Sequence, residues 1–489
     1  MLLNVFSFIN DAILNIYFFI IFAKRNWIML HCIRLLAFPF CIVWAFLLQG
    51  CSSSQQWAQD ENEEVKGSLF NHFVPVEKAE YELNAFLAEI SPSLKSSDRR
   101  VIGHCYTIKA ASTKAEGEPI ILYVFNFEDN QGYAIMPGDD RVPSPMCFVE
   151  EGQYAGDDPD IDLDDFIMSE LRAMYQAARV LPDSIKYEIS LLPEGFIPET
   201  KASGYFPVDT VYSDDRIYVY YSWAQNGTPV GSLLETEWGQ RDPFNDLCPM
   251  VWSDKDSSYV RARAGCVPVA VAQIMAYWKI NPLVGSPYYG LNWNYISPIL
   301  TRYSTPTNYT GWTMLKSLIK TLGDPDNLDA TYGADSTSAS TSNVPRTFVR
   351  FDYSQGGVIQ NYSIDSLLQA LHYGPVLGRG SSKRHYDSNG NIHYYGGHAW
   401  VFDQCLSRMR PVVVYDTDWH IITSQMQVQR LLHINWGWYR VHNGYFTNCH
   451  FDSNSPIVYP LLNTKSPSDA LDVDGYYQYN LKIITGIRP

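Results

Sequence analysis

Residues 264–278 constrain the fold more than any other part of the chain. They read Ala-Gly-Cys-Val-Pro-Val-Ala-Val-Ala-Gln-Ile-Met-Ala-Tyr-Trp, so a helix starting after Gly265 is apolar almost all round. Such a helix has no face for water and must be buried. Pro268 fits its first turn, where backbone N–H groups lack intrahelical partners. The segment therefore predicts a buried helix with Cys266 at its N-terminus.

This position gives the Cys266 thiol a chemical role to consider. A helix dipole favours a thiolate at the N-terminus and lowers the thiol pKa, more so beside an imidazolium. Gly265 lets another backbone or a substrate approach closely. The arrangement suits a nucleophile. Most cysteines in apolar runs are inert core residues, so the hypothesis depends on partners elsewhere in the chain.

Three other motifs supply candidate partners. His398 follows two glycines and opens a strand-like run, which suits a general base aimed at a nucleophile. Asn435 ends another strand-like run, and its carbonyl is suited to accept a hydrogen bond from the Nδ1–H group of His398, with Trp436 over that bond. The Gln240 amide suits an oxyanion hole together with the Cys266 N–H group. For each residue alone, a structural role is the commoner one.

Taken in order, these motifs resemble the streptopain family of papain-like cysteine peptidases. The matching segments lie at 238–245, 265–275, 396–401, 433–438 and 443–446. The resemblance implies an α+β fold, in which a buried helix carrying the cysteine packs on an antiparallel sheet carrying the histidine. It also implies a zymogen with a prodomain.

The resemblance assigns a role to each candidate residue. It implies Cys266 as nucleophile, His398 as general base and acid, and Asn435 as the residue that orients His398. It implies Gln240 as an oxyanion-hole donor and Trp436 as the shield of the His–Asn bond.

The chain departs from the family pattern at three places. Gln404-Cys405 follows Asp403 where the family usually has Gly-Tyr, and Tyr439-Arg440 follows Trp438 where a glycine pair is common. The segment 405–430 is longer than in streptopain and predicts a β-hairpin insertion. These differences leave the catalytic positions intact and bear on the cleft wall, and therefore on substrate preference.

The N-terminal half predicts a small α+β domain. Residues 80–90 and 167–180 have helical spacing, and the runs 120–125 and 133–136 flank a turn as in a hairpin. The segment 181–231 is rich in Pro, Ser, Asp and Tyr without a sustained period, which predicts an irregular linker and a site of maturation cleavage. The expected domains are a signal sequence at 1–50, a lipid-attachment cysteine, tether, prodomain and linker at 51–200, and a papain-like peptidase domain at 201–489.

The N-terminus predicts export. An apolar run at 35–48 follows Arg34 and ends in Leu-Gln-Gly-Cys, which resembles a lipoprotein signal with Cys51 as the lipidated residue. Met29 makes a natural start for such a signal. The run is shorter than the roughly 20 residues that a membrane-spanning helix needs. We therefore expect a cell-envelope or outer-membrane lipoprotein, attached to the membrane only through its lipid, or a protein released after processing.

Charge and cysteine usage exclude other classes of protein. The net charge of −16 argues against nucleic acid as a partner, because phosphate binding needs a basic face. The cysteines outside the signal region show no metal-type pairs, so we expect no metal and no cofactor, and no disulfide can be assigned.

The sequence thus predicts an exported or lipid-anchored cysteine endopeptidase, made as an inactive precursor with its own prodomain as inhibitor and with proteins or peptides as substrates. Two alternatives stay open. One is a catalytically quiet surface lipoprotein that binds protein partners, and the other is a Cys-His peptidoglycan amidase.

Overall fold

The computed structural model describes most of the chain beyond the N-terminal region. The described residues are 72–90, 100–109, 120–154, 171, 175, 187–193, 205–213, 215–305, 309–387, 391–448 and 479–489. The chain separates into two compact units, Met1–Leu69 and Phe70–Pro489, and all described residues belong to the second. The expected signal sequence, the start at Met29 and the lipidated Cys51 lie outside them. Within the described ranges, no helix has the length and apolar character needed to cross a membrane.

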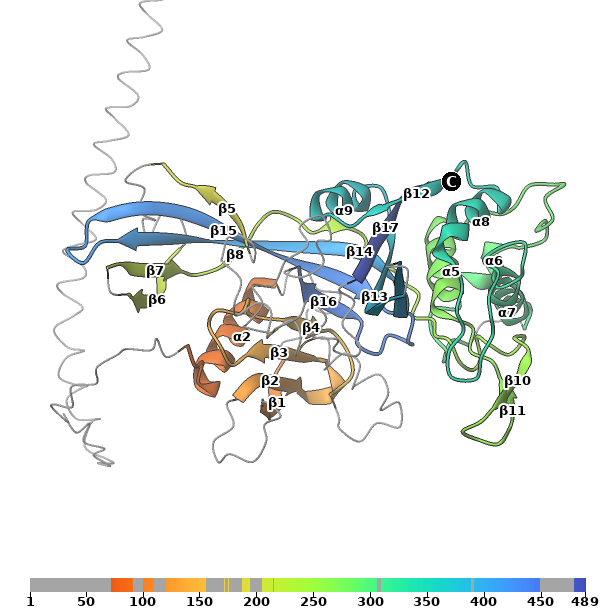
Figure 1. Ribbon diagram of the computed structural model, residues 1–489, viewed down its shortest axis with the longest axis horizontal. Helices are drawn as coiled ribbons and strands as arrows, with labels where there is room; N and C mark the ends of the chain where they lie inside the picture. Colours follow the sequence, from red (N-terminus) through yellow and green to blue (C-terminus); the bar gives the residue numbers. More distant parts are fainter. Residues whose placement is uncertain are drawn as a thin grey trace, which may run out of the picture. The chain divides into compact units, whose positions relative to one another are not determined.

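A long antiparallel sheet runs through this unit (Figure 1). Its strands come from both halves of the sequence, and their order is β1-β2-β3-β4-β16-β15-β14-β13-β17-β12. The first four are β1 Ile102–Lys109, β2 Ile120–Phe127, β3 Tyr133–Pro137 and β4 Cys147–Val149. The other six are β12 Gln355–Asn361, β13 Val376–Tyr386, β14 Ile392–Tyr415, β15 Ile421–Asn435, β16 Gly444–Thr447 and β17 Tyr479–Arg488.

The two halves join where β4 pairs with β16. Gly444 lies opposite Val149, and Phe446 lies opposite Cys147. A Cβ atom on Gly444 would lie 2.3 Å from the carbonyl oxygen of Phe148, so this close approach requires glycine. The strands of the N-terminal segment, residues 72–154, are therefore continuous with the sheet that carries His398.

Most of the elements expected in this N-terminal segment are confirmed. The helix is α2, Val76–Ile90, and it buries Leu83, Phe86 and Ile90 against the sheet. The hairpin is β2–β3, joined by the short 3-10 helix η2, Glu128–Asn130. Of the helix expected at 167–180, only Leu171 and Tyr175 are described, and both are helical.

The expectation of an irregular linker at 181–231 was wrong for much of that segment. It contains β5 Glu188–Leu191, β6 Pro207–Tyr212, β7 Ile217–Tyr221, β8 Ala224–Gln225 and β9 Val230–Gly231. β5 pairs with β15, whereas β7, β8 and β9 pair with β14. The segment lacks an alternating hydrophobic pattern of its own. It is extended because it pairs with strands that are distant in the sequence.

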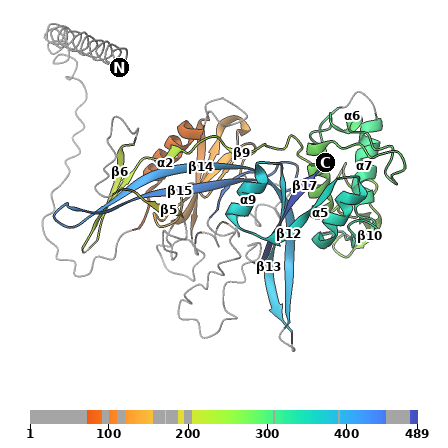
Figure 2. The ribbon, with the colours of Figure 1, turned by 90° about the horizontal axis from the view of Figure 1, so that it is seen from above.

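Those partners form the insertion that the sequence predicts at 405–430. β14 and β15 pair continuously from Val401 and Asn435 to Tyr415 and Ile421, with two register shifts on the way. Figure 2 shows the pair with β5 and β6 alongside it. The hairpin insertion is confirmed, and it extends the same two strands that carry His398 and Asn435.

In the C-terminal half, α5, Cys266–Trp278, is buried from Val267 to Ala276. Three helices share a buried cluster with it, α6 Trp293–Ile296, α7 Thr310–Leu322 and α8 Val344–Arg350, whereas α9 Ile364–Leu371 packs in another cluster on the sheet. α5 packs against β13, β14 and β17 through residues that include Leu377, Val401 and Ile484. The remaining elements are η3 Thr341–Asn343 and the hairpin β10 Met250–Ser253 with β11 Ser258–Arg261. The mixture of helices and antiparallel sheet confirms the α+β class.

Candidate active site

The Cys266 thiol lies at the N-terminus of α5, as the sequence predicts. Gly265 precedes it with a φ of 94°, a left-handed conformation that favours glycine. A Cβ atom there would also lie 3.1 Å from the Thr337 methyl group. Burial raises the pKa of the Cys266 thiol, while hydrogen bonding to backbone groups of Ala399, Val267 and Cys266 itself acts in the opposite direction. The contact with Ala399 brings the thiol beside the residue that follows His398.

His398 lies on β14 opposite Gly380 of β13, and it is 7% exposed. Its Nε2 atom lies 3.0 Å from the main-chain carbonyl oxygen of Trp436. A carbonyl oxygen has no hydrogen to donate, so Nε2 must carry the proton. In the neutral ring, Nδ1 is then the nitrogen that can accept a proton.

Tryptophan rings surround the His398 imidazole. The Trp438 ring is nearest, with its centroid 4.5 Å away, and the Trp436 and Trp400 rings lie at 6.1 Å and 6.3 Å. Burial lowers the pKa of His398 to about 4. The Trp438 ring is thus closer to His398 than the ring of Trp436, and the shielding role expected of Trp436 stays a prediction.

These two shifts set the charge state of the pair in this structure. Near pH 7, Cys266 is a thiol because its pKa is raised, and His398 is a neutral imidazole because its pKa is lowered. A reactive thiolate–imidazolium pair needs the opposite shifts. The buried arrangement therefore holds both groups in a neutral, resting form.

Asn435 does not make the expected hydrogen bond with His398. Its Nδ2 donates to the Thr236 carbonyl at 2.9 Å and to Gln273 Oε1 at 3.2 Å. Its Oδ1 accepts from Gln273 Nε2 at 3.0 Å and from the Gly437 N–H at 3.1 Å. Both donors and both lone pairs are thus occupied. The expected geometry is corrected here, since the Trp436 carbonyl takes the histidine N–H and the proton lies on Nε2 rather than Nδ1.

Gln273 is the residue of this site that sequence reasoning passed over. It is fully buried on α5, where its amide faces that of Asn435 in a reciprocal pair. Its Oε1 also accepts from the Trp238 N–H at 3.2 Å. Gln273 therefore links the helix of the nucleophile to the end of β15 and to the segment carrying Gln240. A lone polar residue in an otherwise apolar helix was the signal available in the sequence.

Gln240 lies on the segment next to the start of α5. Its carbonyl oxygen accepts a hydrogen bond from the Ala264 N–H at 2.8 Å, two residues before Cys266. Among the described residues, no hydrogen bond of its side chain is recorded. The position agrees with an oxyanion-hole donor, and the role itself stays a prediction.

Among the described residues, one group of side chains has the composition and proximity of a metal site, and it lies away from Cys266. It consists of His72, Asp139 and Asp140 in the N-terminal segment. Arg141 donates to both oxygens of Asp139, including a bond of 2.8 Å from Nε to Oδ1. The guanidinium thus supplies positive charge that a metal ion would otherwise provide. The five described cysteines outside the N-terminal region, Cys105, Cys147, Cys248, Cys266 and Cys405, are all free thiols.

Two comparisons with known proteins concern the part of the chain that holds this site. Residues 238–446 match the sequence model described as the Peptidase C10 family. The chain is also 23% identical over 453 residues to the thiol protease/hemagglutinin PrtT of Porphyromonas gingivalis. That alignment covers 84% of this chain and 41% of the relative, so the chain spans less than half of the relative's length.

Proposed function

Residues 238–446 form a domain of the Peptidase C10 family, and on that premise we propose that the chain is a cysteine endopeptidase with Cys266 as its nucleophile. One observation carries the proposal. Cys266, at the start of α5, packs against the buried cluster that contains Ala399, the neighbour of His398 on β14, so two segments distant in the sequence bring the proposed nucleophile and base to the same region. The thiol protease relative supports the same chemistry.

The mechanism follows from the positions of these groups. His398 takes the thiol proton on Nδ1 while its Nε2–H stays bonded to the Trp436 carbonyl. The Cys266 sulfur then attacks the scissile carbonyl carbon, and its own N–H and Gln240 stabilise the resulting oxyanion. His398 next protonates the leaving amine, and water, deprotonated by His398, hydrolyses the thioester.

Active-site alkylation and a substrate comparison test this proposal. We expect iodoacetamide to modify Cys266 and to abolish casein cleavage, with Cys266→Ala equally inactive and Cys405→Ala as active as wild type. Casein cleavage that survives Cys266→Ala would contradict the assignment. Cleavage of cell-wall peptide but not casein would favour a peptidoglycan amidase, and neither activity would favour a quiet binding protein.

We also propose that this structure represents an inactive precursor with the papain-like catalytic arrangement. Its N-terminal segment acts as the prodomain, since β4 pairs with β16 next to the loop of Trp436 and Trp438. Arg440 of that loop forms ion pairs with Glu151 of the N-terminal segment and with Glu237. The neutral state of Cys266 and His398 supports the same proposal.

Maturation and export complete the proposed function. A cut between β5 and β6 separates the N-terminal segment from the peptidase domain, and the apolar run before Cys51 directs the precursor to the cell envelope. N-terminal sequencing of purified wild-type protein should find a new terminus between Leu191 and Pro207, absent from Cys266→Ala. A wild-type chain that stays intact and proteolytically silent would overturn the precursor scheme. Labelling with a fatty-acid analogue that Cys51→Ala abolishes tests the anchor.

A further inference from the structure

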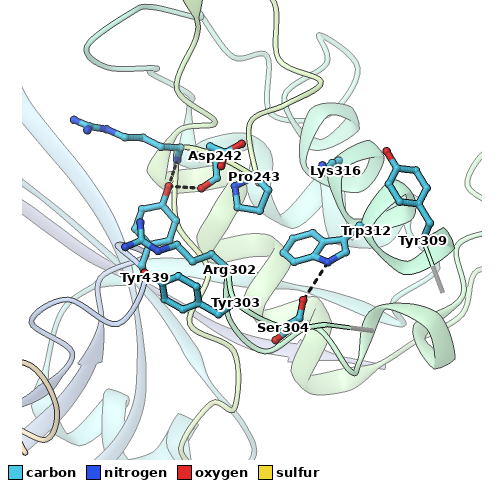
Figure 3. Close-up of a pocket in the computed structure, with 10 residues that line it drawn as sticks. Asp242, Pro243, Arg302, Tyr303, Ser304, Tyr309, Trp312, Lys316 and Tyr439 are labelled. Carbon is cyan, nitrogen blue, oxygen red and sulfur yellow. Dashed lines mark hydrogen bonds between the residues drawn. The ribbon is translucent and has the colours of Figure 1, made fainter. Parts of the chain in front are cut away.

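A pocket lies beside the segment that carries Gln240 (Figure 3). Its lining comes from the residues after Gln240, from the segment 302–304, from α7 and from Tyr439. Its volume of about 620 Å³ is within the range of ligand pockets in general, ~300–1,000 Å³. No step of the proposed mechanism uses it.

Tyr439 connects this pocket to the active site. Its phenol oxygen accepts from the Arg241 N–H at 2.8 Å and donates to the Asp242 carbonyl at 3.2 Å. Its backbone N–H donates to the Trp238 carbonyl at 3.3 Å. A Cβ atom on Gly239 would lie 2.5 Å from the Tyr439 ring, so the glycine makes room for the tyrosine. The pocket wall is thus built on the segment of Gln240, which hydrogen-bonds to Ala264 two residues before Cys266, and on the residue after Trp438, whose ring lies beside His398.

The charge of the lining is positive. Three basic side chains line the pocket, those of Arg241, Arg302 and Lys316, together with one carboxylate, that of Asp242. Lys316 is engaged by Asp246. Burial raises the pKa of Asp242, and the nearby positive charge of Arg302 opposes that shift, although no hydrogen bond or ion pair joins these two described side chains. The Arg302 guanidinium lies over the rings of Tyr439 and Tyr303, with centroid distances of 4.5 Å and 5.0 Å. This stacking holds the guanidinium in place while its N–H groups stay available for a carboxylate.

We propose that this pocket is a substrate subsite that selects an acidic side chain close to the scissile bond, with Arg302 as its partner. The inference rests on the proposed peptidase function and adds a substrate preference to it.

Quenched fluorescent peptides test the preference. A single Glu is scanned through three positions on each side of the scissile bond, with Gln as the uncharged match at every position. We expect kcat/KM to be about tenfold higher for Glu at one position, and the ratio to fall as salt screens the pair. Arg302→Gln should bring the ratio of the two kcat/KM values to about one. Arg302→Glu should favour Lys at the same position.

Two controls separate this proposal from the proposed function. Arg216→Gln, which removes a positive charge from the start of β7, should keep the Glu preference. Full-length Cys266→Ala should bind the best Glu peptide more tightly than its Gln match by fluorescence polarisation, with the difference lost on adding Arg302→Gln. If neither peptide is cleaved but this difference in affinity is found, the proposed peptidase function is wrong and the proposed acidic subsite stands. Equal kcat/KM and equal affinity for the two peptides, or a preference that survives Arg302→Gln, would overturn the subsite.

Discussion

At the scale of single residues, two glutamines near Cys266 have opposite environments. Gln273 is fully buried and makes three hydrogen bonds that join α5, β15 and the segment of Trp238. The Gln240 side chain is half-buried, and its amide forms no hydrogen bond with the described residues. Gln273 therefore stabilises the site, whereas the Gln240 amide keeps the hydrogen-bonding capacity that its proposed oxyanion-hole role requires.

Replacing each glutamine by methionine separates these roles. Gln273→Met leaves the Trp238 N–H without its partner and should lower the free energy of unfolding by about 1–3 kcal/mol. Gln240→Met should change stability by less than about 0.5 kcal/mol. It should lower kcat by about 10²–10³-fold, as expected for an oxyanion-hole donor. Denaturant titration and kinetics of the same two proteins give both values, and a normal kcat in Gln240→Met would rule out its role.

His398 should make the stability of the protein depend on pH. Its pKa is about 4 in the folded chain against 6.5 for the ordinary residue, so the unfolded chain binds the proton more readily. Its contribution is fully present above pH 6.5 and decreases as the pH falls from 6.5 towards 4. Between pH 7 and pH 4.5, wild type should lose about 2 kcal/mol more than His398→Gln. Equal losses in urea titrations at the two pH values would contradict the buried neutral state.

At the scale of elements, the pairing of β4 with β16 leaves no room for a side chain at Gly444. Gly444→Ala places a Cβ atom 2.3 Å from the Phe148 carbonyl oxygen, so the two strands must separate. We expect faster proteolysis and faster hydrogen exchange at β3 and β4 than in wild type. Gly397→Ala serves as the control, because a Cβ atom there would meet no heavy atom closer than 3.7 Å and no strand has to move. Unchanged exchange at β4 in Gly444→Ala would show that the join is not tight.

Elements also differ in how far their own sequences specify them. α2 and α5 have apolar patterns that predict them, and the β2–β3 hairpin has a turn signal between two apolar runs. β5 to β9 have no such pattern, and they are strands because β14 and β15 offer partner edges. Local propensity is a weak guide wherever pairing with a distant strand determines the conformation.

At the scale of the whole molecule, a buried ion pair connects the N-terminal segment to the long hairpin. Arg408 of β14 and Glu89 of α2 approach to 3.1 Å, with side chains 4% and 10% exposed. The Arg408 guanidinium also lies over the rings of Phe86 and Trp223. Burial lowers the pKa of Arg408 to about 10 and raises that of Glu89, so each charge depends on the other.

Breaking this pair should loosen the attachment between the two segments. Glu89→Gln leaves the Arg408 charge buried without its carboxylate, and we expect a loss of about 3–5 kcal/mol in the free energy of unfolding. Glu89→Leu combined with Arg408→Met removes both charges and should cost less than Glu89→Gln alone. Denaturant titration of the three proteins checks the order. A double variant that is the least stable of them would contradict it.

The sequence by itself determined the local elements and the identity of the reactive groups. An apolar helix must be buried, a glycine before its first residue allows the close approach, and the order of motifs indicated Cys266, His398, Asn435 and Gln240. Only the tertiary structure decided which atoms meet. Asn435 pairs with Gln273, the Trp436 carbonyl binds His398, and Trp438 covers it, because hydrogen bonds between distant segments depend on strand register and helix position rather than on local pattern. The basic pocket at Arg302 likewise exists only where four separate parts of the chain meet.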